Sequence, residues 1–133
     1  MHSQASLHAA KEQGKEILLL ESDAIQRDLL RLILEREGYV VETTCDPARA
    51  ETLLRTREFY TVLLEILLPG MNGLKLIRTI REDPSLHQPN FILISALGFK
   101  EVIQQAALLN VSGFLKKPVD SAVLLERLAG NPK

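Results

Sequence analysis

The sequence lacks the features that mark several specialised classes of protein. Its 133 residues include one cysteine, Cys45, and no tryptophan. A single cysteine excludes an intrachain disulfide and fits a reducing compartment. No apolar segment approaches the roughly 20 residues that span a bilayer, and residues 1–15 are polar, without the apolar core of a secretory signal. These absences predict a cytoplasmic protein that does not enter a membrane.

The chain also has little excess of charge. It carries 16 basic and 17 acidic residues, for a formal net charge of −1. A near-neutral chain without a recognition-helix module gives no signal for direct binding of nucleic acid. Hydrophobic residues make up 46% of the sequence, enough for one ordinary hydrophobic core. We therefore expect one globular domain with neither a nucleic acid nor a membrane as its partner.

Short apolar runs alternate with helical segments along the chain. The predicted strands are 17–20, 39–43, 61–64, 91–94 and 113–115. The predicted helices lie between a cap at Asp23 and a stop at Gly38, over 48–57, from 73 to near 83, over 100–109 with a left-handed stop at Asn110, and after a cap at Asp120. Five repeats of strand then helix require parallel strands with right-handed crossovers, so the predicted fold is a doubly wound α/β sheet.

Two local expectations accompany this pattern. The first helix has apolar positions that include Ile25, Leu29, Leu32 and Ile33. Cys45 lies near a strand end, where a buried or half-buried, inert thiol is expected.

Polar residues stand at the ends of four predicted strands. They are Glu21-Ser22-Asp23, Glu65, Ser95 and Lys117-Pro118. In open α/β sheets, binding sites form where the carboxyl ends of the strands meet. Glu65 closes an apolar run and is followed at once by a turn rich in proline and glycine. The sequence therefore predicts one site at this edge, and Glu65 decides its chemistry.

Four motifs, in this order and spacing, resemble the receiver domain of bacterial response regulators. They are Ile17-Leu-Leu-Leu-Glu-Ser-Asp, Leu64-Glu-Ile-Leu-Leu-Pro-Gly-Met-Asn-Gly, Ile94-Ser-Ala and Leu115-Lys-Lys-Pro. That family is a flavodoxin-like module that accepts phosphate on an aspartate from a histidine kinase. The resemblance covers residues 15–130, after a flexible arm at 1–14. It implies a (βα)5 fold with a five-stranded parallel sheet in the order 2-1-3-4-5.

The resemblance implies a role for each polar residue of the predicted site. Glu65 stands at the position of the phosphoacceptor aspartate, and Ser95 and Lys117 stand where the family contacts the phosphoryl group. Phe114 stands at the aromatic switch position. The bond from Lys117 to Pro118 is implied to be cis.

The implied metal site departs from the family pattern. Glu21 and Ser22 stand at the acidic pair that holds Mg²⁺, and Leu67 would offer a backbone carbonyl. Ser22 is neutral, and Glu65 adds a methylene that moves the carboxylate by about 1.5 Å. Misplacement near 1 Å can cost on the order of a hundredfold in rate. We expect weak or absent Mg²⁺ binding and phosphorylation, no other cofactor and no enzymatic activity.

The favoured interpretation is an atypical receiver, or pseudo-receiver. Glu65 would imitate the phosphorylated aspartate, pair with Ser95 and Lys117, and bias Phe114 towards an active-like arrangement. A protein partner would bind the face formed by 100–128. A histidine kinase is a candidate partner, and a homodimer through the same face is a further option.

Other interpretations remain open at the level of sequence. A working phosphoacceptor would use Glu21, Glu65, the Leu67 carbonyl and Mg²⁺. A flavin or nucleotide carrier would need a glycine-rich first loop, but residues 21–24 are acidic instead. Taken one at a time, Glu65 could be a solvated strand-end acid, Lys117 a surface charge and Phe114 a simple core aromatic.

Overall fold

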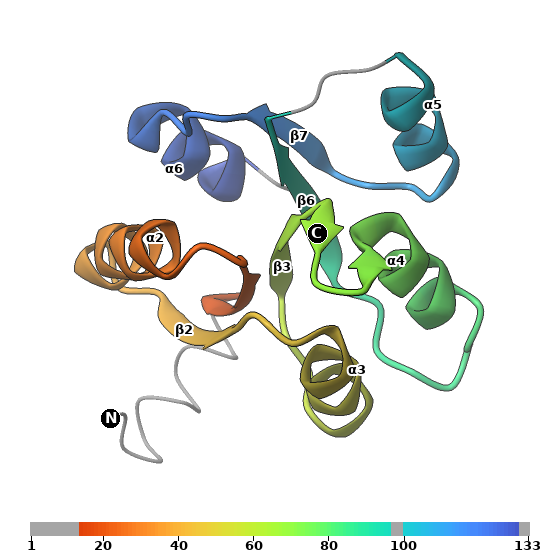
Figure 1. The fold of residues 1–133 in the computed structure, drawn as a ribbon. Coiled ribbons are helices and arrows are strands. Elements are labelled where there is room, and N and C mark those ends of the chain that lie inside the picture. The colour runs from red at the N-terminus through yellow and green to blue at the C-terminus, as the bar shows by residue number, and fades with distance from the viewer. Residues whose placement is uncertain (1–13, 97–99, 131–133) are drawn as a thin grey trace.

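The computed structural model describes residues 14–96 and 100–130. The predicted arm at 1–14 therefore lies outside the described residues, apart from Gly14. Within them, a five-stranded parallel sheet has the order β2-β1-β3-β6-β7 (Figure 1). Its strands are β1 (Glu16–Leu20), β2 (Val40–Thr44), β3 (Thr61–Glu65), β6 (Asn90–Ser95) and β7 (Gly113–Lys116). Counted among these five alone, the order is 2-1-3-4-5, so the predicted flavodoxin-like topology is confirmed.

Helices follow each strand of the sheet, with one short hairpin in addition. They are α2 (Ala24–Arg36), α3 (Pro47–Thr56), α4 (Gly73–Arg81), α5 (Lys100–Leu108) and α6 (Ser121–Ala129). The predicted caps are present: Asp23 Oδ1 accepts from the Ile25 amide at 2.8 Å, and Asp120 Oδ1 accepts from the Ala122 amide at 2.8 Å. Such caps satisfy amide groups that have no partner within the helix.

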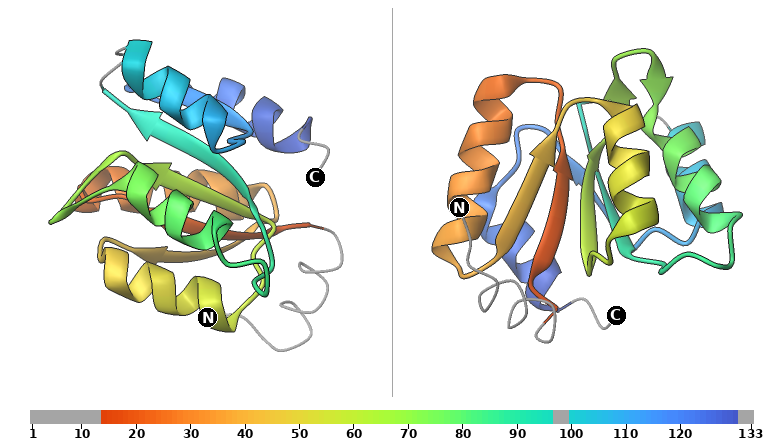
Figure 2. Two further views of the ribbon diagram at one scale, coloured as in Figure 1. Left: turned by 90° about the vertical axis from the view of Figure 1, so that its right-hand side faces the viewer. Right: turned by 90° about the horizontal axis from the view of Figure 1, so that it is seen from below.

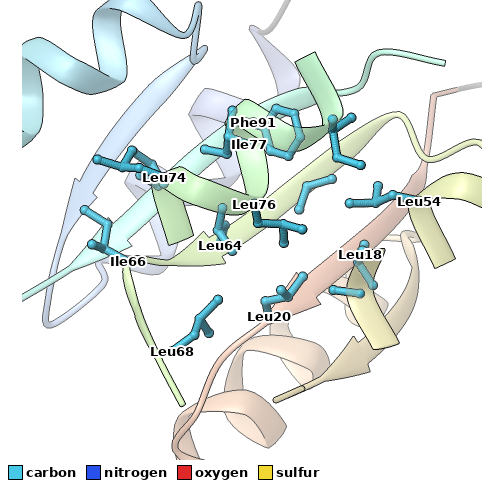
Figure 3. Packing of buried hydrophobic residues seen from close by; sticks show 14 of the residues in the cluster. Leu18, Leu20, Leu54, Leu64, Ile66, Leu68, Leu74, Leu76, Ile77 and Phe91 are labelled. Atoms are coloured by element: carbon cyan, nitrogen blue, oxygen red, sulfur yellow. The ribbon is translucent and has the colours of Figure 1, made fainter. Parts of the chain in front are cut away.

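The sheet is covered by helices on both faces. Figures 1 and 2 show α2 and α6 on one face and α3, α4 and α5 on the other. Every residue of β1 and of β3 is buried, as expected for central parallel strands. Figure 3 shows the larger of two buried clusters, in which Leu18, Leu64 and Phe91 of the sheet meet α3 and α4. The two clusters hold the strand ends, and hence the site, in place.

A short antiparallel hairpin joins β3 to α4. It consists of β4 (Leu67–Leu68) and β5 (Met71–Asn72), and Gly70 takes a left-handed φ of 71° between them. The sequence predicts only a turn here, because two-residue strands carry no periodic signal. Asn72 then caps α4 by accepting a hydrogen bond from the Leu74 amide at 2.8 Å.

The exposed side of α2 differs from the usual amphipathic pattern. Leu30 and Leu34 are the buried residues of this helix, whereas Ile25, Leu29 and Leu32 are 79%, 49% and 53% exposed. Leu30 and Leu34 pack into the smaller buried cluster beneath the helix, and Arg27 donates to the Glu21 carbonyl at 2.8 Å. An apolar position in this leucine-rich helix is therefore no guide to burial.

The prediction for Cys45 is wrong, because this cysteine is exposed. It follows the last residue of β2, Thr44, whose side chain is buried and accepts from the Asp46 amide at 3.0 Å. Successive side chains of a strand point in opposite directions, which turns position 45 outward.

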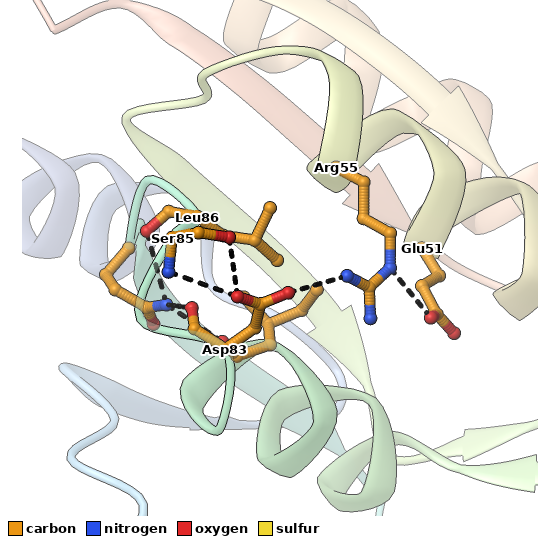
Figure 4. Close-up of polar contacts among 7 residues, drawn as sticks. Glu51, Arg55, Asp83, Ser85 and Leu86 are labelled. Atoms are coloured by element: carbon orange, nitrogen blue, oxygen red, sulfur yellow. Dashed lines mark hydrogen bonds and ion pairs between the residues drawn. The ribbon is translucent and has the colours of Figure 1, made fainter.

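An exposed polar cluster ties α3 to the connection after α4 (Figure 4). Arg55 donates to Glu51 and to Asp83, each at 3.0 Å. Asp83 also accepts from the Ser85 amide at 3.1 Å and from its hydroxyl at 2.6 Å. These contacts join the carboxyl-terminal ends of α3 and α4, at the sheet edge opposite the candidate site.

Glu42 on β2 gives a testable acid dependence. It accepts from Arg49 and Arg57, each at 3.0 Å. Partial burial opposes ionisation, but the two arginine hydrogen bonds outweigh it and hold the pKa of Glu42 below its usual 4.5. A pKa lowered by folding adds stability above the unfolded value, and this stability is lost as the pH falls through the folded value.

We therefore expect Glu42→Gln to lower the free energy of unfolding at neutral pH by about 0.5 kcal/mol, after allowance for solvent screening. At roughly pH 3 the wild type and the variant should converge. Urea denaturation at both pH values measures the difference, with Glu126→Gln at an exposed position of α6 as the control. An equal loss at both pH values would contradict the expectation.

Candidate functional site

Four predicted site residues meet at the carboxyl edge of the sheet. Glu21 directly follows β1, Glu65 ends β3, Ser95 ends β6 and Lys117 directly follows β7. Glu21 and Ser95 are fully buried and Glu65 is 5% exposed. The alternative of a solvated strand-end acid at position 65 therefore does not hold.

Lys117 bridges the two glutamates. Its Nζ donates to Glu21 Oε2 at 3.1 Å and forms a direct ion pair with Glu65 Oε1. The Lys117 amide also donates to the Ser95 carbonyl at 2.8 Å, which fixes the start of this side chain beside β6. One ammonium thus holds two carboxylates that come from different strands.

The charges of this cluster shift the pKa values of its members. Burial, together with the nearby Glu21 carboxylate, raises the pKa of Glu65 even though Lys117 opposes the shift. Burial alone would lower the pKa of Lys117, but its bonds to Glu65 and Glu21 raise it. Both directions follow from two carboxylates that share one ammonium in a partly buried place.

Glu21 is held by contacts that the sequence analysis missed. Its Oε2 accepts from the Asp23 amide at 3.2 Å as well as from Lys117. Arg27 holds the Glu21 carbonyl from one turn into α2. Glu21 Oε1 is buried and has no hydrogen-bond partner among the described residues. The sequence did offer a signal for one of these contacts, because Arg27 stands six positions after the strand-end acid Glu21.

Gly73 allows α4 to start against the end of β3. Its amide donates to the Ile66 carbonyl at 2.6 Å. A Cβ at this position would lie 2.6 Å from the Glu65 carbonyl oxygen, closer than such atoms can approach. A residue without a side chain is therefore required here. Its close contact fixes the position of the Glu65 backbone relative to α4.

The two other positions of the predicted metal site, Ser22 and Leu67, add no further carboxylate. Ser22 is exposed and so is the Leu67 side chain, at 54%. Among residues 14–96 and 100–130, no three histidine, cysteine or acidic side chains are grouped closely enough to hold a metal ion. Mg²⁺ prefers an octahedron of oxygen ligands with carboxylates among them. With Lys117 bonded to both glutamates, only Glu21 Oε1 remains as a buried, uncommitted ligand, so the described donor set fits Mg²⁺ poorly.

The two other predicted site residues lie in β7 and just after it. Phe114 on β7 is partly buried and packs against the larger core cluster. The peptide bond between Lys117 and Pro118 is cis. None of the helices in the described part of the chain has the length and apolar character needed to cross a membrane.

Comparison with known proteins gives matches over most of the chain. The family described as the response regulator receiver domain matches residues 17–129. The chemotaxis protein CheY-3 of Vibrio cholerae is 28% identical over 123 residues, covering 92% of this chain and 95% of that protein. The transcriptional regulatory protein CrdR of Helicobacter pylori is 33% identical over 114 residues, or 86% of this chain. The chain spans about half the length of CrdR, 53%.

Solved structures give the same result. A CheY-like receiver domain protein from Methanospirillum hungatei has a TM-score of 0.78 at 26% identity, covering 86% of this chain and 90% of that one. The non-phosphorylated HemR receiver domain from Leptospira biflexa has a TM-score of 0.78 at 29% identity, with the same coverage. Together with the fold and the strand-end residues, these matches show that the chain belongs to the response regulator receiver domain family of two-component signalling.

Proposed function

We propose that this receiver domain signals without phosphorylation and that Glu65 takes the part of a phosphorylated aspartate. The observation that carries the proposal is the ion pair between Glu65 and Lys117. In the family, the residue at position 117 pairs with the phosphoryl group. Here a built-in carboxylate supplies the negative charge, which biases the domain towards one conformation as an added phosphate would.

The chemistry of phosphoryl transfer supports this proposal. Transfer needs an in-line nucleophile and a hard cation that neutralises the phosphate oxygens. At Glu65, Oε1 is engaged by Lys117. At position 22, a neutral and exposed serine replaces an acid. The domain is therefore proposed to bind Mg²⁺ weakly at most and to catalyse no reaction.

The proposed output is binding of a protein partner by the face formed by 100–128. Ile103 and Leu108 of α5 and Val123 of α6 are 45%, 87% and 37% exposed there. These apolar groups suit a protein surface better than open solvent. The domain is proposed to work in the cytoplasm, with a histidine kinase as one candidate partner and a homodimer through this face as another option.

An NMR titration tests the proposal. Amide spectra are recorded with Mg²⁺ alone and then with Mg²⁺ and beryllofluoride, an analogue of the phosphoryl group. We expect no saturable shift at Glu21, Glu65 or Lys117, because the ammonium already occupies the carboxylates. Saturable shifts that spread from these residues to Phe114 and α5 would contradict the proposal.

The same titration examines a second candidate function, a working phosphoacceptor. The observation in its favour is Glu21 Oε1, which is buried and has no hydrogen-bond partner among the described residues. Buried carboxylate oxygens usually find a partner, and a cation or a water could serve. Saturable Mg²⁺ shifts would support this second function.

A further inference from the structure

A stripe of apolar side chains on α2 faces away from the sheet. Ile25, Leu29 and Leu32 are exposed, while Leu30 and Leu34 of the same helix are buried on the inward side. Figure 1 shows α2 on the outer side of the sheet, across the sheet from α3 and α4. The helix therefore carries apolar side chains on two sides, but only the side with Leu30 and Leu34 is buried in the domain. Large apolar side chains that cluster on an exposed face mark interaction sites.

The spacing of the stripe suits another helix. Its members are separated by four and then three residues, the alternation found along the seam of two packed helices. Such a seam buries each side chain between those of the facing helix. A flat or loop-built partner surface would not require this spacing.

The charges beside the stripe suit a second copy of the same helix. Along one flank of the helix, Arg31 Nη2 forms an ion pair with Asp28 Oδ1 at 3.6 Å, and Arg31 Nη1 forms one with Glu35 Oε1 at 3.5 Å. Asp28 and Arg31 are equally far along the helix from the point midway between Leu29 and Leu30. Two antiparallel copies that meet at this point would therefore set Asp28 of each copy opposite Arg31 of the other. The net charge of −1 leaves little long-range repulsion between copies.

We propose that α2 is the contact surface for a second copy of this chain, packed antiparallel about a two-fold axis. A contact made by one pair of helices buries less than the roughly 1,200 Å² of a stable interface, so the association is weak and transient. This contact lies on a different surface from the 100–128 face, and it does not depend on the state of Glu65.

Concentration-dependent NMR and sedimentation velocity test the proposal on the full chain, over about 10 µM to 1 mM. We expect amide shifts confined to α2 and a rising sedimentation coefficient. The paired change Ile25→Gln and Leu32→Gln should weaken self-association by more than about tenfold. Both side chains are about half exposed or more, and the rest of the amide spectrum reports whether the fold is kept. Cys45→Ser, at an exposed residue outside α2 and outside the 100–128 face, is the control and should leave the association unchanged. Leu108→Gln, at an 87% exposed leucine of α5, examines the 100–128 face instead.

Charge reversal separates this contact from unspecific hydrophobic association. Asp28→Arg and Arg31→Asp should each weaken the association, and the double variant should restore it. The proposal is overturned if the chain stays monomeric throughout this range. It is also overturned if Leu108→Gln alone abolishes the association, or if a helix of another protein binds α2 while this chain remains a monomer.

Discussion

A variant that carries both Ser22→Asp and Glu65→Asp is expected to be phosphorylated by a small acyl phosphate, in the presence of Mg²⁺, at least about a hundredfold faster than the wild type. The first change adds a carboxylate beside Glu21, where Mg²⁺ lacks a ligand. The second shortens the side chain at position 65 by one methylene, so that its carboxylate no longer extends far enough to form the present ion pair with Lys117. Mass spectrometry of the intact chain measures the added phosphoryl group over time.

The single variants make this prediction sharper. Ser22→Asp alone should improve Mg²⁺ binding but leave the nucleophile misplaced, and Glu65→Asp alone should leave the cation weakly held. Each should therefore fall well short of the double variant. If the wild type is phosphorylated as fast as the double variant, Glu65 is a competent acceptor and the proposed function is wrong.

Lys117→Met is expected to destabilise the fold by about 3 kcal/mol, because removing one partner from a buried ion pair leaves the other charge uncompensated. The Lys117 side chain is 22% exposed, while those of Glu21 and Glu65 are 0% and 6% exposed. Two buried carboxylates would then face each other without a cation. Urea denaturation at neutral pH measures the loss, and Lys116→Met at the exposed neighbouring residue is the matched control.

A second substitution distinguishes the ion pair from simple packing. Adding Glu65→Gln to Lys117→Met removes one of the two uncompensated charges and should restore part of the lost stability. Equal stability of Lys117→Met and the wild type would show that the bridge contributes nothing. A loss that Glu65→Gln does not reduce would assign the effect to packing of the lysine stem.

Most of the fold could be predicted because its signals are local. A buried apolar run, a capping aspartate such as Asp23 and a left-handed stop such as Asn110, at φ 62°, are each readable within a few residues. The alternation of strand and helix then restricts the topology to few choices. The meeting of Glu65, Ser95 and Lys117 at one edge follows from parallel strands.

The remaining features depend on side-chain geometry across long separations. Lys117 bonds to Glu21 over a sequence separation of 96 residues, and no local pattern shows which carboxylate a lysine will choose. The inward side of α2 likewise depends on the packing of Leu30 and Leu34 against distant residues of the sheet and of α6, which the count of leucines does not show. The exposure of Cys45 depended on the strand ending at Thr44 with its side chain inward.

The close approach at Gly73 has a consequence for the choice of acid at position 65. Gly73, at the start of α4, packs so closely against the Glu65 carbonyl that the backbone of Glu65 cannot shift towards α4. The added length of glutamate over aspartate can therefore be taken up only in the forward direction, towards the ammonium. Because the backbone is fixed from behind, one additional methylene is enough to bring the Glu65 carboxylate into a direct ion pair with Lys117. An aspartate at the same position would be shorter, and a phosphoryl group bound to it would take that place.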